Sequence, residues 1–286
     1  MTGLAVKSFS YFSILDLPKE RSLHTSPTPT AGGFVFILIF CILIFIYDFK
    51  DILTLNWLVF SLGLSLLGGL DDIKPQKVRT RLLGQFVLAI FCWSTLLEYL
   101  LPNSLLLINN YSSFMFLLIF TLVSLLHINL FNFMDGSDGF AATQGIVFFS
   151  FHAIVFLFSG AEPLAIYCLT LVSILIGFLV YNWPPAKIFM GDTGSQSLGA
   201  SLAVTSILLK QEIVLAVAGG LFVIETISVM LQVTYFKFSK GKRLFLMAPL
   251  HHHYEKKGLS EQKIVIRFWI LSFLFCLLAL SLLKIR

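Results

Sequence analysis

The fold follows from the stretch LLIFTLVSLLHINLFNFMDGSDGFAATQGIVFFSFHAIVFLF, residues 117–158. Two apolar runs, 113–131 and 138–159, meet in it at a short polar segment rich in glycine and aspartate. Each run is close to the ~20 residues that a helix needs to cross the hydrocarbon of a bilayer. Neither run has the polar face of an amphipathic surface helix. The stretch therefore predicts two membrane-spanning helices joined by a polar turn.

The rest of the chain repeats this pattern. Hydrophobic residues make up 57% of the 286 residues and charged residues only 12%, against roughly a quarter in an ordinary soluble domain. Backbone groups in lipid must bond within their own segment, so long apolar runs indicate helices rather than barrel strands. We predict an all-α, polytopic transmembrane helical bundle that forms a single domain over residues 1–286. About nine spans are expected, at residues 31–47, 53–70, 82–101, 113–131, 138–159, 162–182, 194–209, 212–236 and 264–283.

Basic residues are distributed unevenly between the loops. A cytoplasmic amino terminus places 16 of the 20 Lys and Arg residues on the cytoplasmic side. Cytoplasmic loops of membrane proteins carry such an excess, so the pattern predicts this orientation. The asymmetry also accounts for the net charge of +5 without nucleic acid as a partner. Residues 1–30 are then a cytoplasmic or interfacial entry segment, and residues 237–263 a cytoplasmic loop rich in histidine.

A pair of adjacent acids ends the second span, and like the other polar motifs it falls on the predicted cytoplasmic side. In GGLDDIKPQKVRTR, residues 68–81, Asp71 and Asp72 are followed by basic residues that include Lys74 and Lys77. Adjacent carboxylates repel each other unless a cation stabilises them, so the motif suits a divalent metal and phosphate oxygens. A solvated, charged helix end is the alternative.

The polar turn between the fourth and fifth spans carries four further candidates. In NLFNFMDGSDGFA, Asn129, Asn132, Asp135 and Asp138 recur every three residues, which on a helical path puts them near one face. Polar groups at a membrane boundary are unfavourable unless they have partners or a use. The motif therefore favours a functional site over a simple polar turn.

A glycine-flanked acid follows the sixth span. The segment YNWPPAKIFMGDTGSQSLG, residues 181–199, stops one helix at two prolines and begins the next close to Asp192. Mg²⁺ prefers one or two carboxylates together with water and substrate phosphate, so Asp192 is a candidate metal ligand. Helix capping alone is the alternative.

The longest loop contains three consecutive histidines. In APLHHHYEKKG, residues 248–258, His251, His252 and His253 are too close in sequence to form a zinc site of the i, i+4 kind. Imidazoles and lysines beside a phosphate site would instead bind anions or donate hydrogen bonds. A solvated basic loop explains the lysines but not the histidines.

One acid lies within a predicted span. Glu225 falls in the run 212–236, so its charge lies at membrane depth. An intramembrane acid is either paired for structure or used in function, and the sequence leaves both alternatives open.

Together these motifs resemble the polyprenyl-phosphate N-acetylhexosamine-1-phosphate transferase superfamily, glycosyltransferase family 4. The match runs from about residue 16 to the end, with five motifs in the family's order. FMGDTGS, IETISVMLQV, MAPLHHHYEKKG and IRFW are similar to the phospho-N-acetylmuramoyl-pentapeptide transferases of peptidoglycan synthesis. LDLPKERSLHTSPTPTAGG and NLFNFMDGSDG look more like the enzymes that start O-antigen synthesis. Members usually have ten spans, and we expect this chain to lack a counterpart of the first.

The resemblance implies a reaction. A Mg²⁺-dependent enzyme of the bacterial inner membrane would transfer a sugar 1-phosphate from a UDP-sugar to undecaprenyl phosphate, releasing UMP at its cytoplasmic loops. The carboxy-terminal third favours UDP-MurNAc-pentapeptide as donor, and the amino-terminal half favours a simpler UDP-HexNAc. The resemblance also admits a homodimer. A transporter of an anionic or lipid-linked substrate is the alternative, but it predicts ion sites at the membrane midplane, whereas these polar motifs lie at span ends.

The resemblance also implies residue roles. Asp192 would bind Mg²⁺, and Asp71 would deprotonate or align the lipid phosphate with support from Asp72. Asp135 matches a residue assigned as nucleophile or nucleotide contact, so direct attack and a covalent intermediate both stay open. His251 is expected to take part in catalysis.

Substrate contacts are expected from a second set of residues. The family's lysine three residues after the aspartate pair is replaced by Pro75, so Lys74 or Lys77 is expected to take its place. The remaining expected contacts are Asn132, Asp138, Asn182, Phe189, His252 and His253.

Overall fold

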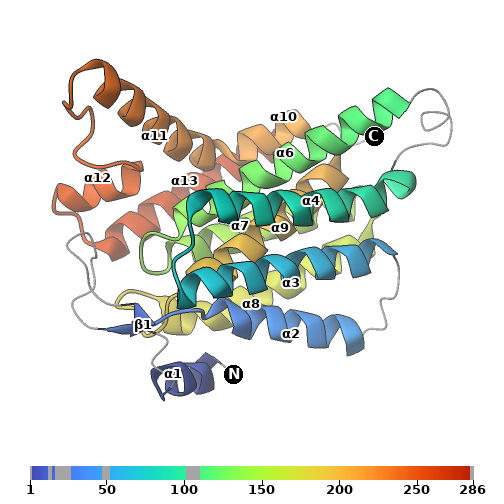
Figure 1. The fold of residues 1–286 in the computed structure, drawn as a ribbon, viewed down its shortest axis with the longest axis horizontal. Coiled ribbons are helices and arrows are strands. Elements are labelled where there is room, and N and C mark those ends of the chain that lie inside the picture. Colours follow the sequence, from blue (N-terminus) through green and yellow to red (C-terminus); the bar gives the residue numbers. More distant parts are fainter. Residues whose placement is uncertain (1, 12–14, 17–26, 47–51, 101–109, 284–286) are drawn as a thin grey trace. The chain divides into compact units, whose positions relative to one another are not determined.

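The computed structural model describes every residue except 1, 12–14, 17–26, 47–51, 101–109 and 284–286. Its described part is almost entirely helical (Figure 1), which confirms the predicted all-α fold. A short antiparallel pair, β1 (Leu15–Asp16) and β2 (Thr28–Pro29), places Leu15 opposite Pro29. Residues 17–26 of the predicted entry segment lie outside the described residues. The chain divides into two compact units, and the prediction of a single domain stays a prediction.

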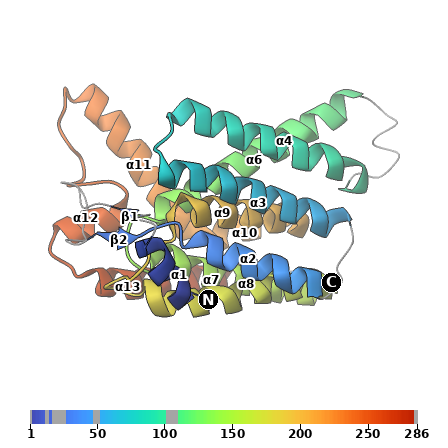
Figure 2. The ribbon, with the colours of Figure 1, turned by 60° about the horizontal axis from the view of Figure 1, so that its bottom comes forward.

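The first unit comprises residues 1–132 and 187–208. In it α2, α3 and α4 lie side by side in two views (Figures 1 and 2). Buried hydrogen bonds join α9 to its neighbours: Trp57 Nε1 donates to Ser201 Oγ at 3.0 Å, and Gln85 Nε2 to Gln196 Oε1 at 3.1 Å. Such bonds hold helices together where lipid offers no hydrophobic driving force. Its helices are α1 (Thr2–Tyr11), α2 (Gly33–Ile46), α3 (Ile52–Ile73), α4 (Val78–Leu100), most of α6 (Asn110–Met134) and α9 (Gly191–Leu209).

The second unit comprises residues 133–186 and 209–286. Its core forms where α7 packs against α8 and α13. Phe148 of α7 also contacts Phe222 of α11 edge-on, at 4.7 Å between ring centroids. A buried hydrogen bond from Ser272 to Gln144 joins α13 to α7. Its helices are α7 (Phe140–Phe158), α8 (Glu162–Asn182), α10 (Glu212–Ala218), α11 (Gly220–Phe238), α12 (Leu250–Lys256) and α13 (Glu261–Leu282).

Each predicted span corresponds to one helix, except that one span is divided into two helices. Among the described residues, 7 helices are long and apolar enough to cross a membrane: α3, α4, α6, α7, α8, α11 and α13. The run 212–236, predicted as one helix, is instead divided into α10 and α11. The break falls at Gly219 and Gly220, and glycine is among the weakest helix formers. The count of nine spans stays a prediction.

A close approach of α3 to α9 can be tested by adding a methyl group. A Cβ on Gly68 would lie 2.2 Å from the carbonyl oxygen of Asp192. Gly68→Ala must push α3 away from the first turn of α9, and overpacking of this kind destabilises by about 1–3 kcal/mol. We expect a lower melting temperature for the detergent-solubilised protein.

Gly177→Ala on α8 is the matched control, because a Cβ there meets nothing within 4 Å. It should melt at or slightly above the wild-type temperature, since alanine is the better helix former by up to about 1 kcal/mol. Equal melting temperatures for the two variants would contradict the close contact.

Candidate functional site

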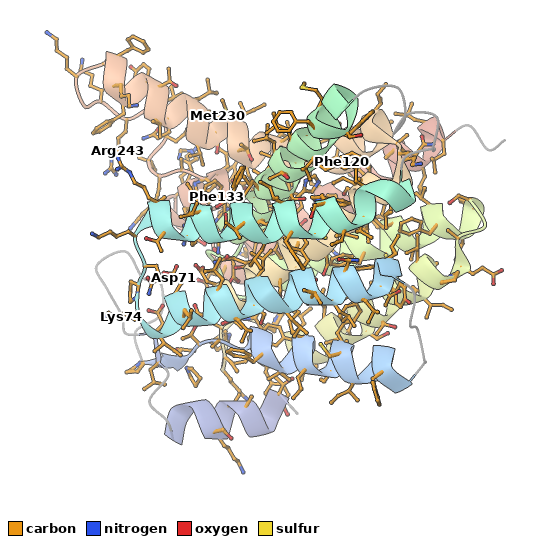
Figure 3. All side chains as sticks on the ribbon, turned by 45° about the vertical axis from the view of Figure 1, so that its right-hand side comes forward. Asp71, Lys74, Phe120, Phe133, Met230 and Arg243 are labelled. Carbon is orange, nitrogen blue, oxygen red and sulfur yellow. The ribbon has the colours of Figure 1, made fainter. Side chains whose placement is uncertain are left out.

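Five polar side chains gather in the first unit, and we call them the carboxylate cluster: Asp71, Asp72, Arg81, Asn132 and Asp192. Each comes from the end of a helix, so apolar segments deliver polar groups to one place. Figure 3 shows Asp71 near the carboxyl end of α3, with Lys74 just beyond it. The structure thus brings together four of the residues that the sequence predicted, from three separate motifs.

Asp72 fixes the start of α9. Its Oδ1 accepts the backbone N–H of Asp192 at 2.9 Å, and its Oδ2 accepts the N–H and the hydroxyl of Thr193 at 3.0 and 2.6 Å. The first N–H groups of a helix have no partner within the helix, and this carboxylate supplies one from α3. Gly191, at φ 71°, leaves room for it, because a Cβ there would lie 2.5 Å from Asp72 Oδ2. Asp72 therefore positions Asp192.

Arg81 joins the other two acids. Its Nη1 donates to Asp71 Oδ2 at 3.0 Å and to Asp192 Oδ2 at 2.9 Å. Asn132 approaches from α6 and donates to Asp192 Oδ1 at 2.7 Å and to Ser195 Oγ at 2.8 Å. Two acids from different helices are thus held against a single guanidinium.

The cluster carries more negative than positive charge. Burial, followed by the hydrogen bond with Asp71, raises the pKa of Asp192 to about 6. Three carboxylates face one guanidinium, so a bound cation would relieve their repulsion. Among the described residues no three His, Cys, Asp or Glu side chains are arranged to hold a metal ion. A pair of carboxylates completed by water and phosphate oxygens is nevertheless the arrangement that suits Mg²⁺.

Arg81 was not among the site residues predicted from the sequence, and the two lysines that were predicted do not belong to the carboxylate cluster. Lys74 and Lys77 are exposed, and Arg81 is half-buried against the acids. Arg81 precedes Gln85 and Ala89 by one and two helical turns, so all three lie on one face of α4, but the sequence alone does not show that this face is buried. Gln85 and Ala89 are both buried, so Arg81 lies on the buried side of α4.

The end of the predicted entry segment and the residues that follow it form backbone hydrogen bonds with the segment before Asp192. Phe189 N–H donates to the carbonyl of Pro29 at 2.8 Å, and the Phe189 carbonyl accepts the N–H of Gly32 at 2.9 Å. The Met190 carbonyl accepts the N–H of Gly33. Phe189, predicted to contact the nucleotide, is half-buried in this pairing. The motif that leads into α2 and the motif that leads into α9 are therefore hydrogen-bonded to each other within the first unit.

A second group of polar side chains surrounds α12 in the second unit. We call it the histidine cluster, and its members are Gly136, Ser137, Glu225, His251, His252 and Glu255. Ser137 donates to Glu255, and His252 Nδ1 lies 2.6 Å from the other carboxylate oxygen of Glu255. A Cβ on Gly136 would lie 2.8 Å from His252 Nε2 and 3.1 Å from His251 Nε2. The glycine beside Asp135 thus lets both imidazoles approach the turn.

The three histidines occupy different environments. His251 is fully buried, with its ring 4.8 Å from that of Phe140 and 4.2 Å from that of His252. His252 is half-buried against Glu255. His253 Nδ1 accepts the N–H of Leu246 at 3.1 Å, so this ring binds the loop that precedes α12. Their predicted roles stay predictions, but the histidines are not interchangeable.

Two further predicted residues hold the polar turn in place. Asp138 accepts the backbone N–H of Ala186 at 2.8 Å, and Asn182 accepts that of Gly139 at 3.2 Å. Both bonds join the turn after α6 to the segment at the end of α8. Asp135 is half-buried in the same turn.

Comparison with known proteins identifies the family. The model of glycosyl transferase family 4 matches residues 54–210, more than half of the chain. A phospho-N-acetylmuramoyl-pentapeptide-transferase of Rickettsia bellii (strain OSU 85-389) is 39% identical over 95% of this chain and 84% of its own length. One of Geobacillus sp. (strain WCH70) is 39% identical over 92% of this chain and 86% of its own.

The chain belongs to glycosyl transferase family 4, with the phospho-N-acetylmuramoyl-pentapeptide transferases. The predicted resemblance is therefore confirmed, and the chain is a multi-pass membrane transferase. The family comprises phosphotransferases that usually depend on a metal. The transporter alternative finds no support in it.

The capping role of Asp72 in this family 4 transferase can be separated from the role of Asp71. Asp72→Asn replaces an acceptor oxygen by an amide that faces backbone N–H or hydroxyl donors, and leaving such buried groups unpaired destabilises by about 1–3 kcal/mol. Asp71→Asn should change stability less, because it also relieves repulsion from Asp192. Thermal unfolding of both purified variants measures the difference, and an equal or larger loss for Asp71→Asn would refute it.

Proposed function

We propose that this chain transfers phospho-MurNAc-pentapeptide from UDP-MurNAc-pentapeptide to undecaprenyl phosphate and releases UMP at the cytoplasmic face of the bacterial inner membrane. The observation that carries the proposal is the placement of Asp192, seated by Asp72 and linked to Asp71 through Arg81. The family and the printed names of the relatives support the reaction and favour this donor over a simpler UDP-HexNAc.

The carboxylate cluster is proposed to act on the phosphates. A lipid phosphate oxygen must attack the phosphorus that carries the sugar, and the bond between the two donor phosphates must break as UMP leaves. Asp71 is proposed to take the acceptor's proton or to align its phosphate, because its carboxylate accepts two hydrogen bonds, from Gln76 and Arg81, whereas that of Asp72 accepts three from the start of α9. Arg81 would keep Asp71 and Asp192 at a fixed separation and partly neutralise them. Positioning and charge compensation of this kind are the main protein contributions to phosphoryl transfer.

Mg²⁺ is proposed to bind Asp192, with Asp71 as the nearest second carboxylate. When bound, it would supply a Lewis acid for the donor phosphate oxygens and offset the charge that develops on UMP. Asn132 would hold the orientation of Asp192 through its bond to Oδ1.

The remaining predicted residues are proposed to contact substrates. Asn132, Asp138, Asn182, Phe189, His252 and His253 would bind the nucleotide sugar, His251 would assist catalysis, and Lys74 or Lys77 would attract anionic substrate. Asp135 is proposed either to attack the donor itself, which gives a covalent intermediate, or to contact the nucleotide while the lipid phosphate attacks directly.

A UMP-release assay tests the proposal directly. The purified protein, with Mg²⁺ and undecaprenyl phosphate, should release UMP from UDP-MurNAc-pentapeptide at least about a hundredfold faster than from UDP-GlcNAc. Removal of Mg²⁺ with EDTA should stop the release, and added Mg²⁺ should restore it. Asp192→Asn should lose about a hundredfold or more in kcat.

Glu162→Gln, an exposed acid at the start of α8, is the control and should keep full activity. Full turnover by Asp192→Asn would overturn the metal role. Preference for UDP-GlcNAc would overturn the donor, and no UMP from either donor would overturn the reaction.

Arg81 gives a further prediction. Arg81→Met leaves Asp71 and Asp192 without their shared cation, so kcat should fall by about a hundredfold, and Arg81→Lys should recover part of it through its ammonium charge. Arg79→Met, an exposed arginine two residues earlier, is the matched control and should stay close to wild type. Equal losses for the two methionine variants would show that the contact with the acids is unimportant.

A further inference from the structure

Glu225 is a buried acid in the described part of α11, and the reaction proposed above does not use it. Its side chain is 2% exposed, although it belongs to a helix long and apolar enough to cross a membrane. An unpaired carboxylate in such a place is strongly unfavourable, so its partners indicate what it does. All the partners described here belong to the start of α12.

The carboxylate of Glu225 bonds the backbone of the histidine segment. Oε2 accepts the N–H of Leu250 at 2.6 Å, and Oε1 accepts the N–H of His251 at 3.2 Å. Oε1 also lies 3.4 Å from His251 Nδ1. The first N–H groups of α12 would otherwise lack partners, and the two side-chain oxygens of Glu225 supply them. Glu225 therefore fixes where α12 begins.

The other end of α12 is bonded to the polar turn. Ser137 donates to Glu255, and Glu255 binds His252 Nδ1, which leaves His252 Nε2 directed at Gly136. Because α12 has only 7 residues, it has little stability of its own, and these contacts determine its position. A shift at its first residue would move His251 and His252 away from the turn.

We infer that Glu225 is a positioning residue for the histidine segment: it holds α12 so that His251 and His252 face the turn at Gly136. Glu225 does not touch substrate in this role, and it acts through the backbone of Leu250 and His251. The part of the inference that links the histidines to the donor rests on the proposed function. The part that concerns the position of α12 rests on the contacts alone.

Two variants of Glu225 test the inference through kinetics. Glu225→Ala removes both acceptor oxygens, and the KM for UDP-MurNAc-pentapeptide should rise by about tenfold or more, with the KM for undecaprenyl phosphate within about twofold of wild type. Glu225→Gln keeps one acceptor oxygen, and its donor KM should rise only about threefold. A merely structural loss would lower the active fraction, hence kcat, and leave the donor KM unchanged.

Trypsin gives a readout that needs no catalysis. Lys256 and Lys257 are exposed at the end of α12, and cleavage there requires the segment to open. In detergent-solubilised full-length protein, Glu225→Ala should be cut at these sites about tenfold faster than wild type, and Glu225→Gln at an intermediate rate. Thr226→Ala is the matched control, since the Thr226 hydroxyl donates to Phe222 within α11, and it should behave as wild type.

The outcomes separate the two proposals. Wild-type cleavage and wild-type donor KM in Glu225→Gln, or in a folded Glu225→Ala, would overturn the positioning role while leaving the reaction intact. If Glu225→Ala does not fold, the threefold rise in donor KM and the intermediate cleavage rate expected of Glu225→Gln test the positioning role. If the wild-type protein releases no UMP, the proposed function fails, and the trypsin result still decides whether Glu225 holds α12.

Discussion

The carboxylate of Asp72 is the contact on which the arrangement of the first unit depends. It belongs to α3 but binds the first N–H groups of α9, so it fixes two distant segments of sequence against each other. The contact needs backbone close to backbone, and Gly68 and Gly191 provide this by having no Cβ in the way. Asp192 is the second residue of α9, so its position follows from the bond that caps the helix. The same contact between α3 and α9 therefore determines both how these helices pack and where Asp192 lies.

The charge balance of the cluster explains why it suits a reaction between two anions. Asp71 and Asp192 share Arg81, so the protein fixes negative charge in place without fully neutralising it. A site for phosphate transfer must hold a cation and still let anionic substrates enter and leave. Carboxylates balanced by one guanidinium allow both, because a metal and substrate phosphates can bind and depart together. This is consistent with the family to which the chain belongs.

The fold class and the aspartates could be predicted from the sequence, whereas the contacts between them could not. Long apolar runs identify helices because lipid leaves the backbone no other partner, and acids at their ends stand out against that background. Arg81 was indistinguishable from its basic neighbours, since its role depends on which face of α4 is buried. The division between α10 and α11 was missed because two glycines within an apolar run leave the hydrophobic pattern unchanged. The consecutive histidines gave no indication that their environments differ.

Acids in both units divide into two kinds, and the division follows from desolvation. Asp72 and Glu225 have their oxygens occupied by backbone N–H groups of another helix, so burial is compensated and the acid fixes a helix start. Asp192 accepts its carboxylate bonds from side chains, and Asp71 accepts one from a side chain and one from the backbone N–H of Gln76 in the loop after α3. The side-chain donors can rearrange when a ligand enters. A backbone partner cannot rearrange without moving its helix. Rigid backbone bonds therefore set the frame, and exchangeable side-chain bonds leave reactive oxygens available within it.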